Sequence, residues 1–101
     1  MPERPTILVI DDEEAICSAF VRYFRRRGFE VETALTAAEG HRCVETSAPA
    51  VAFIDVRLPD GSGLELLEQF ANIAADTAVI VITAYGSLET VAEAVRRRAF
   101  D

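Results

Sequence analysis

The chain has 101 residues, of which 50% are hydrophobic, so it is long enough for one small domain with a buried core. Its formal net charge of −7 argues against direct binding to nucleic acid, because a phosphate backbone attracts proteins with a positive surface. No apolar stretch approaches the roughly 20 residues that a membrane-spanning helix needs, and residues 1–5 do not have the shape of a signal peptide. These properties favour a single cytoplasmic domain.

Strand and helix patterns alternate along the chain. Continuous apolar runs predict strands that are buried on both faces, whereas the alternation of apolar and polar residues over 29–33 predicts an edge strand. The predicted strands cover residues 6–10, 29–33, 50–55 and 78–83. The predicted helices cover residues 14–27, 36–46, 64–74 and 88–98, and residues 56–63 have the composition of a loop.

The helices are predicted from apolar stripes and capping residues. The stripe of the first helix consists of Ala15, Ile16, Ala19, Phe20, Tyr23 and Phe24. Two capping boxes, Thr36 with Glu39 and Ser62 with Glu65, predict where the second and third helices begin. Alternating strands and helices imply right-handed crossovers and a parallel sheet with helices on both faces, which is an α/β fold.

Three of the predicted strands end in side chains that carry oxygen atoms. Asp11 and Asp12 follow the first strand, Asp55 ends the third, and Thr83 ends the fourth. Because the carboxyl ends of parallel strands lie on one edge of the sheet, we expect these groups to converge. Mg²⁺ prefers carboxylates and water in a near-octahedral shell, and an aspartate can act as the nucleophile toward a phosphoryl group. The sequence therefore predicts a metal site in which Asp55 accepts phosphate and Thr83 donates a hydrogen bond to it.

The same residues lie in motifs that extend over the whole chain. These motifs are Asp11-Asp12-Glu13, Asp55 followed by Arg57-Leu58-Pro59-Asp60-Gly61, and Thr83-Ala84. Together they resemble the receiver domain of two-component response regulators. The resemblance implies a flavodoxin-like, doubly wound parallel sheet with strand order 2-1-3-4-5. It also implies that Asp55 is the phosphorylated aspartate and Thr83 the switch hydroxyl. The Mg²⁺ ligands that it implies are Asp11, Asp12, Asp55 and the main-chain carbonyl of Arg57.

Two features depart from the family pattern. Receiver domains carry a lysine at the end of the fifth strand, a few residues after an Ala-Phe-Asp motif, whereas this chain contains no lysine and ends at Ala99-Phe100-Asp101. We therefore expect residues 1–101 to be a C-terminally incomplete receiver domain, without its fifth strand and helix. Without them the fourth strand would be an exposed apolar edge, which predicts dimerisation or poor solubility. The second departure is Arg98, which stands where relatives usually carry glycine.

The resemblance implies a role in signal transduction. The domain would take a phosphoryl group from a histidine kinase or a phosphotransfer protein onto Asp55. The loop and helix over residues 84–98 would then switch a covalently linked output domain outside this chain. Residues 82–90 are similar to receivers of the nitrogen-regulator class, which often carry a sigma-54-activating ATPase and a DNA-binding domain, so we expect the output to be transcription. The domain would not be an enzyme, beyond catalysing its own phosphorylation and dephosphorylation.

Two other functions remain open at this point. A pseudo-receiver would bind partners without phosphate, and the missing lysine favours it if the natural protein ends at Asp101. A haloacid-dehalogenase-type phosphatase also uses an aspartate after a strand, but it needs a second aspartate two positions later, where this chain has Arg57. Cys17 and Cys43 are expected to be reduced thiols, and two cysteines with one histidine, widely spaced, do not form a zinc site.

Overall fold

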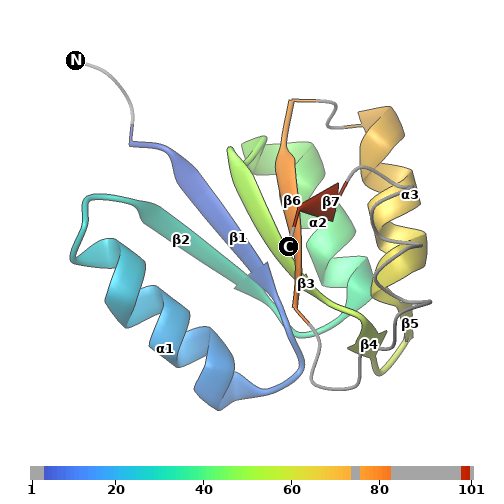
Figure 1. The fold of residues 1–101 in the computed structure, drawn as a ribbon, viewed down its shortest axis with the longest axis horizontal. Helices are drawn as coiled ribbons and strands as arrows, with labels where there is room; N and C mark the ends of the chain where they lie inside the picture. Colours follow the sequence, from blue (N-terminus) through green and yellow to red (C-terminus); the bar gives the residue numbers. More distant parts are fainter. Residues whose placement is uncertain (1–3, 74–75, 83–98, 101) are drawn as a thin grey trace.

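The computed structural model describes residues 4–73, 76–82 and 99–100 of the chain. Strands and helices alternate through most of this part, as the sequence predicts (Figure 1). The elements in chain order are β1 (Thr6–Ile10), α1 (Glu14–Arg25), β2 (Glu30–Ala34), α2 (Ala37–Ser47), β3 (Val51–Asp55), β4 (Arg57–Leu58), β5 (Gly61–Ser62), α3 (Gly63–Ile73), β6 (Ala78–Ile82) and β7 (Ala99–Phe100).

The main sheet has the order β2-β1-β3-β6-β7, and each pair of neighbouring strands is parallel. The predicted order of the first four strands, 2-1-3-4, is therefore confirmed, with β6 as the fourth. The structure corrects one detail of the prediction, because β7 lies in the position of a fifth strand and pairs with Val79 and Ile80. The unpaired backbone groups of an apolar strand edge favour such an addition even when only two residues can pair.

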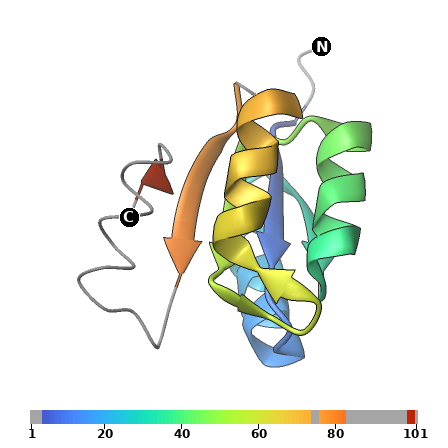
Figure 2. The ribbon, with the colours of Figure 1, turned by 90° about the vertical axis from the view of Figure 1, so that its right-hand side faces the viewer.

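Helix α1 covers one face of the sheet, and α2 and α3 cover the other (Figure 1, Figure 2). Side chains of a strand alternate between its two faces. Leu8 and Ile10 of β1 therefore belong to the core beneath α2 and α3, whereas Ile7 and Val9 belong to the core beneath α1. All four are at most 3% exposed. This explains why β1 is a continuous apolar run, and it confirms that the strand is buried on both faces.

Helix α1 buries a different stripe from the predicted one. Phe20 and Phe24 pack against the sheet as expected, and their ring centroids lie 4.9 and 5.7 Å from that of Phe53 on β3. Cys17, which the prediction left out of the stripe, is buried beside them. The other side of the predicted stripe is exposed at Ala15, Ala19 and Tyr23. The aromatic contacts with the sheet set the rotation of the helix about its axis, and the sequence of the helix alone does not contain them.

The segment predicted as a loop over residues 56–63 contains a small antiparallel hairpin. Arg57 pairs with Ser62 and Leu58 with Gly61, so that residues 59 and 60 form a two-residue turn. Leu58 is only 8% exposed and joins the core beneath α2 and α3. The hairpin is therefore anchored to the body of the domain by an apolar side chain.

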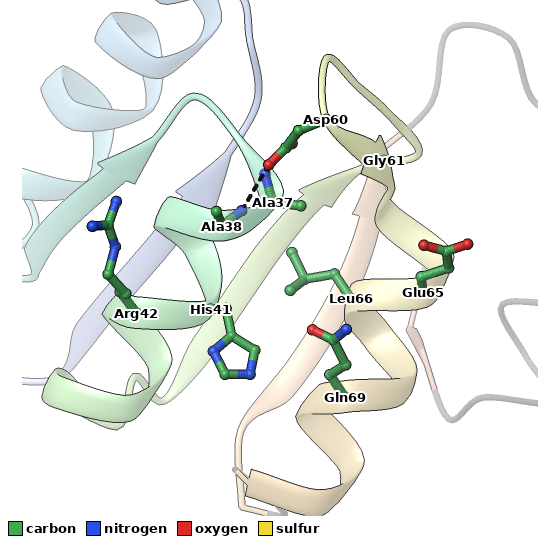
Figure 3. Close-up of a pocket in the computed structure, with 9 residues that line it drawn as sticks. All are labelled: Ala37, Ala38, His41, Arg42, Asp60, Gly61, Glu65, Leu66 and Gln69. Atoms are coloured by element: carbon green, nitrogen blue, oxygen red, sulfur yellow. Dashed lines mark hydrogen bonds between the residues drawn. The ribbon is translucent and has the colours of Figure 1, made fainter.

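Helices α2 and α3 lie side by side, and a groove runs between them (Figure 3). Cys17 and Cys43 are both free thiols. No helix in the described ranges is long and apolar enough to cross a membrane. Thr83 and the helix predicted over residues 88–98 lie outside the described residues, so those expectations stay predictions.

Candidate functional site

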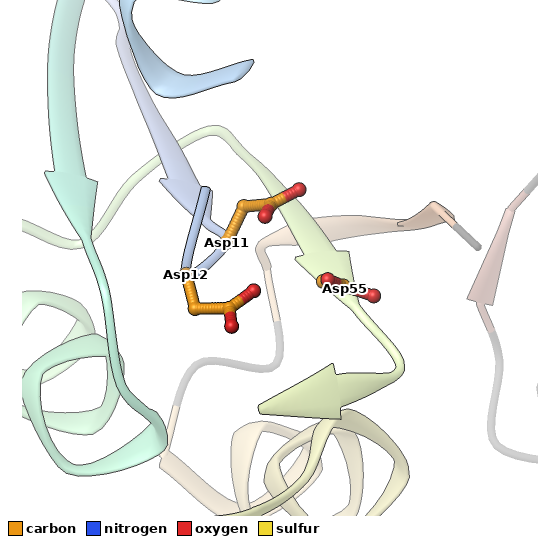
Figure 4. A group of neighbouring side chains, drawn as sticks. All are labelled: Asp11, Asp12 and Asp55. Atoms are coloured by element: carbon orange, nitrogen blue, oxygen red, sulfur yellow. The ribbon is translucent and has the colours of Figure 1, made fainter. Parts of the chain in front are cut away.

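Asp11, Asp12 and Asp55 meet at the carboxyl edge of the sheet (Figure 4). The neighbouring strands β1 and β3 pair in parallel up to Ile10 and Ile54, so the residues that follow in each strand leave the sheet side by side. One carboxylate oxygen from each of the three aspartates lies within 4.8 Å of the other two. The sequence predicted this convergence, and it follows directly from the parallel register of the two strands.

The backbone and side chain of Asp11 are both held in place. Its N–H donates to the carbonyl oxygen of Ala34 at 3.0 Å, which extends the pairing of β1 with β2 by one residue. Its Oδ1 accepts a hydrogen bond from the N–H of Glu13 at 2.9 Å, and its carbonyl accepts one from the thiol of Cys17 at 3.4 Å. Asp11 is only 4% exposed, whereas its neighbour Asp12 is open to solvent. The pair therefore combines a fixed carboxylate with an accessible one.

Asp55 is half-buried at the end of β3, and its charge is poorly stabilised. Partial burial is the main reason that its pKa is raised, and the negative charges of Asp11 and Asp12 add to the effect. A hydrogen bond from the N–H of Arg57 to its Oδ1, at 3.2 Å, acts in the opposite direction. A cation placed between the three carboxylates would remove the repulsion and favour the ionised form of Asp55.

The backbone beyond Asp55 is fixed by two further hydrogen bonds. The N–H of Val56 donates to the carbonyl oxygen of Ile82 at 3.3 Å. The N–H of Gly63 donates to the carbonyl oxygen of Val56 at 2.8 Å. These bonds join the end of β3 to β6 and to the first residue of α3. The segment that begins at Arg57, whose main-chain carbonyl the family resemblance implies as a metal ligand, is thus held close to Asp55.

The residues present fit a hard divalent cation. Mg²⁺ takes oxygen ligands and keeps part of its water shell, and this cluster offers three carboxylates, of which that of Asp12 is exposed to solvent. The three carboxylates repel one another because their oxygens lie within 4.8 Å, and a bound cation would offset this repulsion. The three carboxylates of Asp11, Asp12 and Asp55 therefore suit a cation such as Mg²⁺.

The structure adds two residues that sequence reasoning did not single out for this site. Gly63 packs against the backbone of Asp55, and Asp60 contacts the first residues of α2. For Gly63, the only signal in the sequence is a small residue after a turn, which is weak evidence for a close contact. No local pattern could have revealed the second, since the partners of Asp60 lie 22 and 23 residues away along the chain.

Comparison with known proteins decides which family this site belongs to. The family model described as response regulator receiver domain matches residues 7–101. The chain belongs to this family. The receiver domain predicted from the motifs is thereby confirmed, and with it a signalling domain of two-component systems rather than a member of an enzyme family. Receiver domains generally bind Mg²⁺ in an acidic pocket, and this chain has a cluster of three carboxylates, those of Asp11, Asp12 and Asp55.

This receiver domain is 38% identical over 96 residues to the photosynthetic apparatus regulatory protein RegA of Rhodobacter capsulatus. The match covers 95% of this chain and 52% of RegA, so the chain spans about half the length of that relative. A CheY-like receiver domain protein from Methanospirillum hungatei has a similar crystal structure, with a TM-score of 0.92 and 34% identity over 96% of this chain and 78% of that one.

A third comparison concerns the chemistry of the site. The crystal structure of a response regulator from Burkholderia pseudomallei contains a phosphorylated aspartic acid, a calcium ion and citrate. It matches with a TM-score of 0.89 and 29% identity, over 94% of this chain and 56% of that chain. The CheY-like, flavodoxin-like fold implied by the resemblance is confirmed by both structures.

Proposed function

We propose that this receiver domain accepts a phosphoryl group on Asp55, with a Mg²⁺ ion held by Asp11, Asp12, Asp55 and the main-chain carbonyl of Arg57. The observation that carries the proposal is the meeting of three carboxylates within 4.8 Å at the ends of β1 and β3. An isolated acidic residue at a strand end is common, whereas three that meet on adjacent strands support the proposal of a site.

The proposed reaction is a phosphoryl transfer to a carboxylate. An oxygen of Asp55 attacks phosphorus, the P–N bond of a phosphohistidine on the donor breaks, and the departing imidazole nitrogen keeps the electron pair and takes up a proton from water. A bound Mg²⁺ would neutralise charge on the phosphoryl oxygens. The N–H of Arg57, 3.2 Å from Asp55 Oδ1, orients the acceptor carboxylate.

The donor that we propose is a histidine kinase or a phosphotransfer protein. Support for a phosphorylated aspartate comes from the Burkholderia pseudomallei relative, whose structure contains one together with a calcium ion. We further propose that Thr83 binds the new phosphoryl group and that residues 84–98 pass the change to an output domain that controls transcription. The length of RegA, about twice that of this chain, is consistent with an output domain beyond the receiver.

Self-association belongs to the proposal as well. Within residues 76–82 and 99–100, strand β7 is two residues long and pairs with β6 at Val79 and Ile80. An apolar strand with unpaired backbone groups favours pairing with a second copy. Sedimentation of the purified chain measures this directly, and a single monomeric species over a wide concentration range would contradict it.

The intact mass of the chain after incubation with Mg²⁺ and acetyl phosphate tests the acceptor. We expect one phosphoryl adduct in the natural chain and none in Asp55→Asn. Asp76→Asn is the matched control, because Asp76 is an exposed aspartate in the turn before β6, away from the three carboxylates. An adduct that persists in Asp55→Asn would place the acceptor elsewhere.

The alternative is a pseudo-receiver that binds partners without phosphate, and the absence of lysine favours it only if the natural protein ends at Asp101. Its signature would be an unmodified mass in the same experiment, although Mg²⁺ still binds. The phosphatase alternative is not supported, because the family model over residues 7–101 is that of a receiver domain and Arg57 occupies the position of the required second aspartate.

A further inference from the structure

Asp60 connects two parts of the domain that are distant in the chain. It lies in the turn of the β4–β5 hairpin, which follows Asp55 directly. Its Oδ1 accepts a hydrogen bond from the N–H of Ala37 at 2.7 Å, and its Oδ2 accepts one from the N–H of Ala38 at 3.1 Å (Figure 3). A carboxylate in the hairpin that follows β3 thus binds the beginning of α2.

Residues near the start of α2 accept hydrogen bonds from only some of the free N–H groups there. The Thr36 hydroxyl accepts a hydrogen bond from the N–H of Glu39 at 3.1 Å, as the predicted capping box requires. The Glu39 carboxylate reaches back to the N–H of Leu35 at 3.0 Å. The first N–H groups of a helix lack partners within the helix, and this local cap leaves the N–H groups of Ala37 and Ala38 without an acceptor. Asp60 supplies both acceptors.

The two hydrogen bonds of Asp60 can hold the hairpin firmly against α2. Both oxygens of one carboxylate are used, and a negative charge at a helix N-terminus is favoured by the helix dipole. The two N–H groups of Ala37 and Ala38 are the main reason that the pKa of Asp60 lies below its usual value. Asp60 is therefore ionised at neutral pH, and it acts as a charged clamp although its surface is exposed.

The other end of the same hairpin is part of the proposed metal site. The N–H of Arg57 donates to Asp55 Oδ1 at 3.2 Å, and Arg57 pairs with Ser62 across the hairpin. A two-residue turn allows little relative movement of its strands. A displacement of Asp60 would therefore also displace Arg57. The chain of contacts runs from Asp55 through the hairpin to α2.

We propose that Asp60 is a positioning residue that clamps the β4–β5 hairpin to α2 and thereby places the main-chain carbonyl of Arg57 for the metal. The proposal rests on the function proposed above for Asp55. It has a reciprocal consequence, because a ligand that tightens the hairpin also tightens the N-terminus of α2. Helix α2 then responds to occupation of the site although it contributes none of the ligands.

Amide NMR of the ¹⁵N-labelled chain during a Mg²⁺ titration tests the coupling. In the natural chain we expect the resonances of Ala37 and Ala38 to shift with the same Kd as that of Arg57, and their hydrogen exchange to slow. In Asp60→Asn the Arg57 resonance should still shift, with a Kd for Mg²⁺ raised roughly tenfold, which is the low end of losses when the support of a ligand is removed. The responses of Ala37 and Ala38 should disappear.

Glu65→Gln is the matched control, since Glu65 is another exposed acid that lines the same groove between α2 and α3 (Figure 3). It removes the same charge from that groove and should leave the coupling intact. Equal losses in both variants would show that charge alone matters, and they would overturn the clamp.

The titration of the natural chain separates the two proposals. A shift of Arg57 without any response of Ala37 and Ala38 would overturn the clamp and leave the metal site standing. Persistent responses of Ala37 and Ala38 in Asp60→Asn would also overturn it. No Mg²⁺-dependent change at Asp55 or Arg57 would overturn the proposed metal site, and the clamp with it.

Discussion

Gly63 begins α3 directly against the backbone of Asp55. A Cβ atom at position 63 would overlap the carbonyl oxygen of Asp55 and lie 2.8 Å from Cγ2 of Ile54. Most of what it would meet is backbone, which cannot move aside as the end of a flexible side chain can. The contact lets α3 start immediately behind the end of β3, and it makes the position of Asp55 depend on the absence of a side chain at residue 63.

Gly63→Ala is therefore expected to lower the free energy of unfolding by about 1–3 kcal/mol, the usual cost of overfilling a packed region. The strain acts on Asp55 itself, so phosphorylation by acetyl phosphate should slow as well. Urea denaturation and the rate of adduct formation measure the two effects. Gly61→Ala is the control, because a Cβ there would meet only Glu65 Oε2, at an ordinary 3.9 Å. Equal behaviour of the two variants would contradict this account.

Asp55→Asn should make the domain more stable at neutral pH in the absence of Mg²⁺. The folded-state pKa of Asp55 is raised above its ordinary value of 3.8. At a pH between the ordinary pKa and the raised one, the folded chain therefore binds more protons than the unfolded chain. Its ionised carboxylate therefore opposes folding at higher pH, and this penalty disappears as the pH falls below the ordinary value. Thermal unfolding from pH 3 to 8 should show a gain for the variant that shrinks in acid. A gain independent of pH would argue against repulsion as its cause.

The pH dependence of Asp60 should have the opposite sign. Its pKa is lowered in the folded state by the N–H groups of Ala37 and Ala38, so its contribution is present above the unfolded pKa and is lost as the pH falls through the folded one. The stability difference between the natural chain and Asp60→Asn should therefore be largest at neutral pH and vanish in strong acid. A difference that grows on acidification would be incompatible with these hydrogen bonds.

Mg²⁺ should stabilise the fold through the three carboxylates. A ligand that binds only the folded state at about ten times its Kd adds about 1.4 kcal/mol to the free energy of unfolding. Asp12→Asn should lose most of this gain and still fold, because Asp12 is exposed. Calorimetric melting with and without Mg²⁺ measures the effect, and Asp76→Asn serves as control. An unchanged Mg²⁺ effect in Asp12→Asn would remove that residue from the metal site.

The core beneath α2 and α3 supports the site from behind. Phe70 of α3 is 1% exposed and belongs to the same cluster as Ile54, the residue before Asp55. Phe70→Ala should cost about 3–5 kcal/mol, enough to unfold a marginal domain. Tyr23→Ala should cost under about 1 kcal/mol, because Tyr23 is 52% exposed and contacts the Arg27 guanidinium 3.7 Å from its ring centroid. Similar losses of stability in the two variants would contradict the burial of Phe70 and the exposure of Tyr23.

The sequence by itself determined the framework of the domain and most of its chemistry. Each apolar run predicted a strand because burial on both faces demands apolar residues at consecutive positions. The acids that follow β1 and β3 could be placed together because parallel strands end on the same edge of a sheet. Asp11, Asp12 and Asp55 were therefore predictable, and the structure brings them within 4.8 Å of one another.

Only the tertiary structure decided how distant segments meet. The rotation of α1 depends on the contacts of Phe20 and Phe24 with Phe53, which lies on a different element. Asp60 finds its partners in α2 across more than 20 residues, and Gly63 matters because of what lies behind it. Periodicity and capping are properties of neighbouring residues, whereas these contacts arise when elements pack. The meeting of the three carboxylates could thus be predicted from the sequence, whereas the contacts that support them could not.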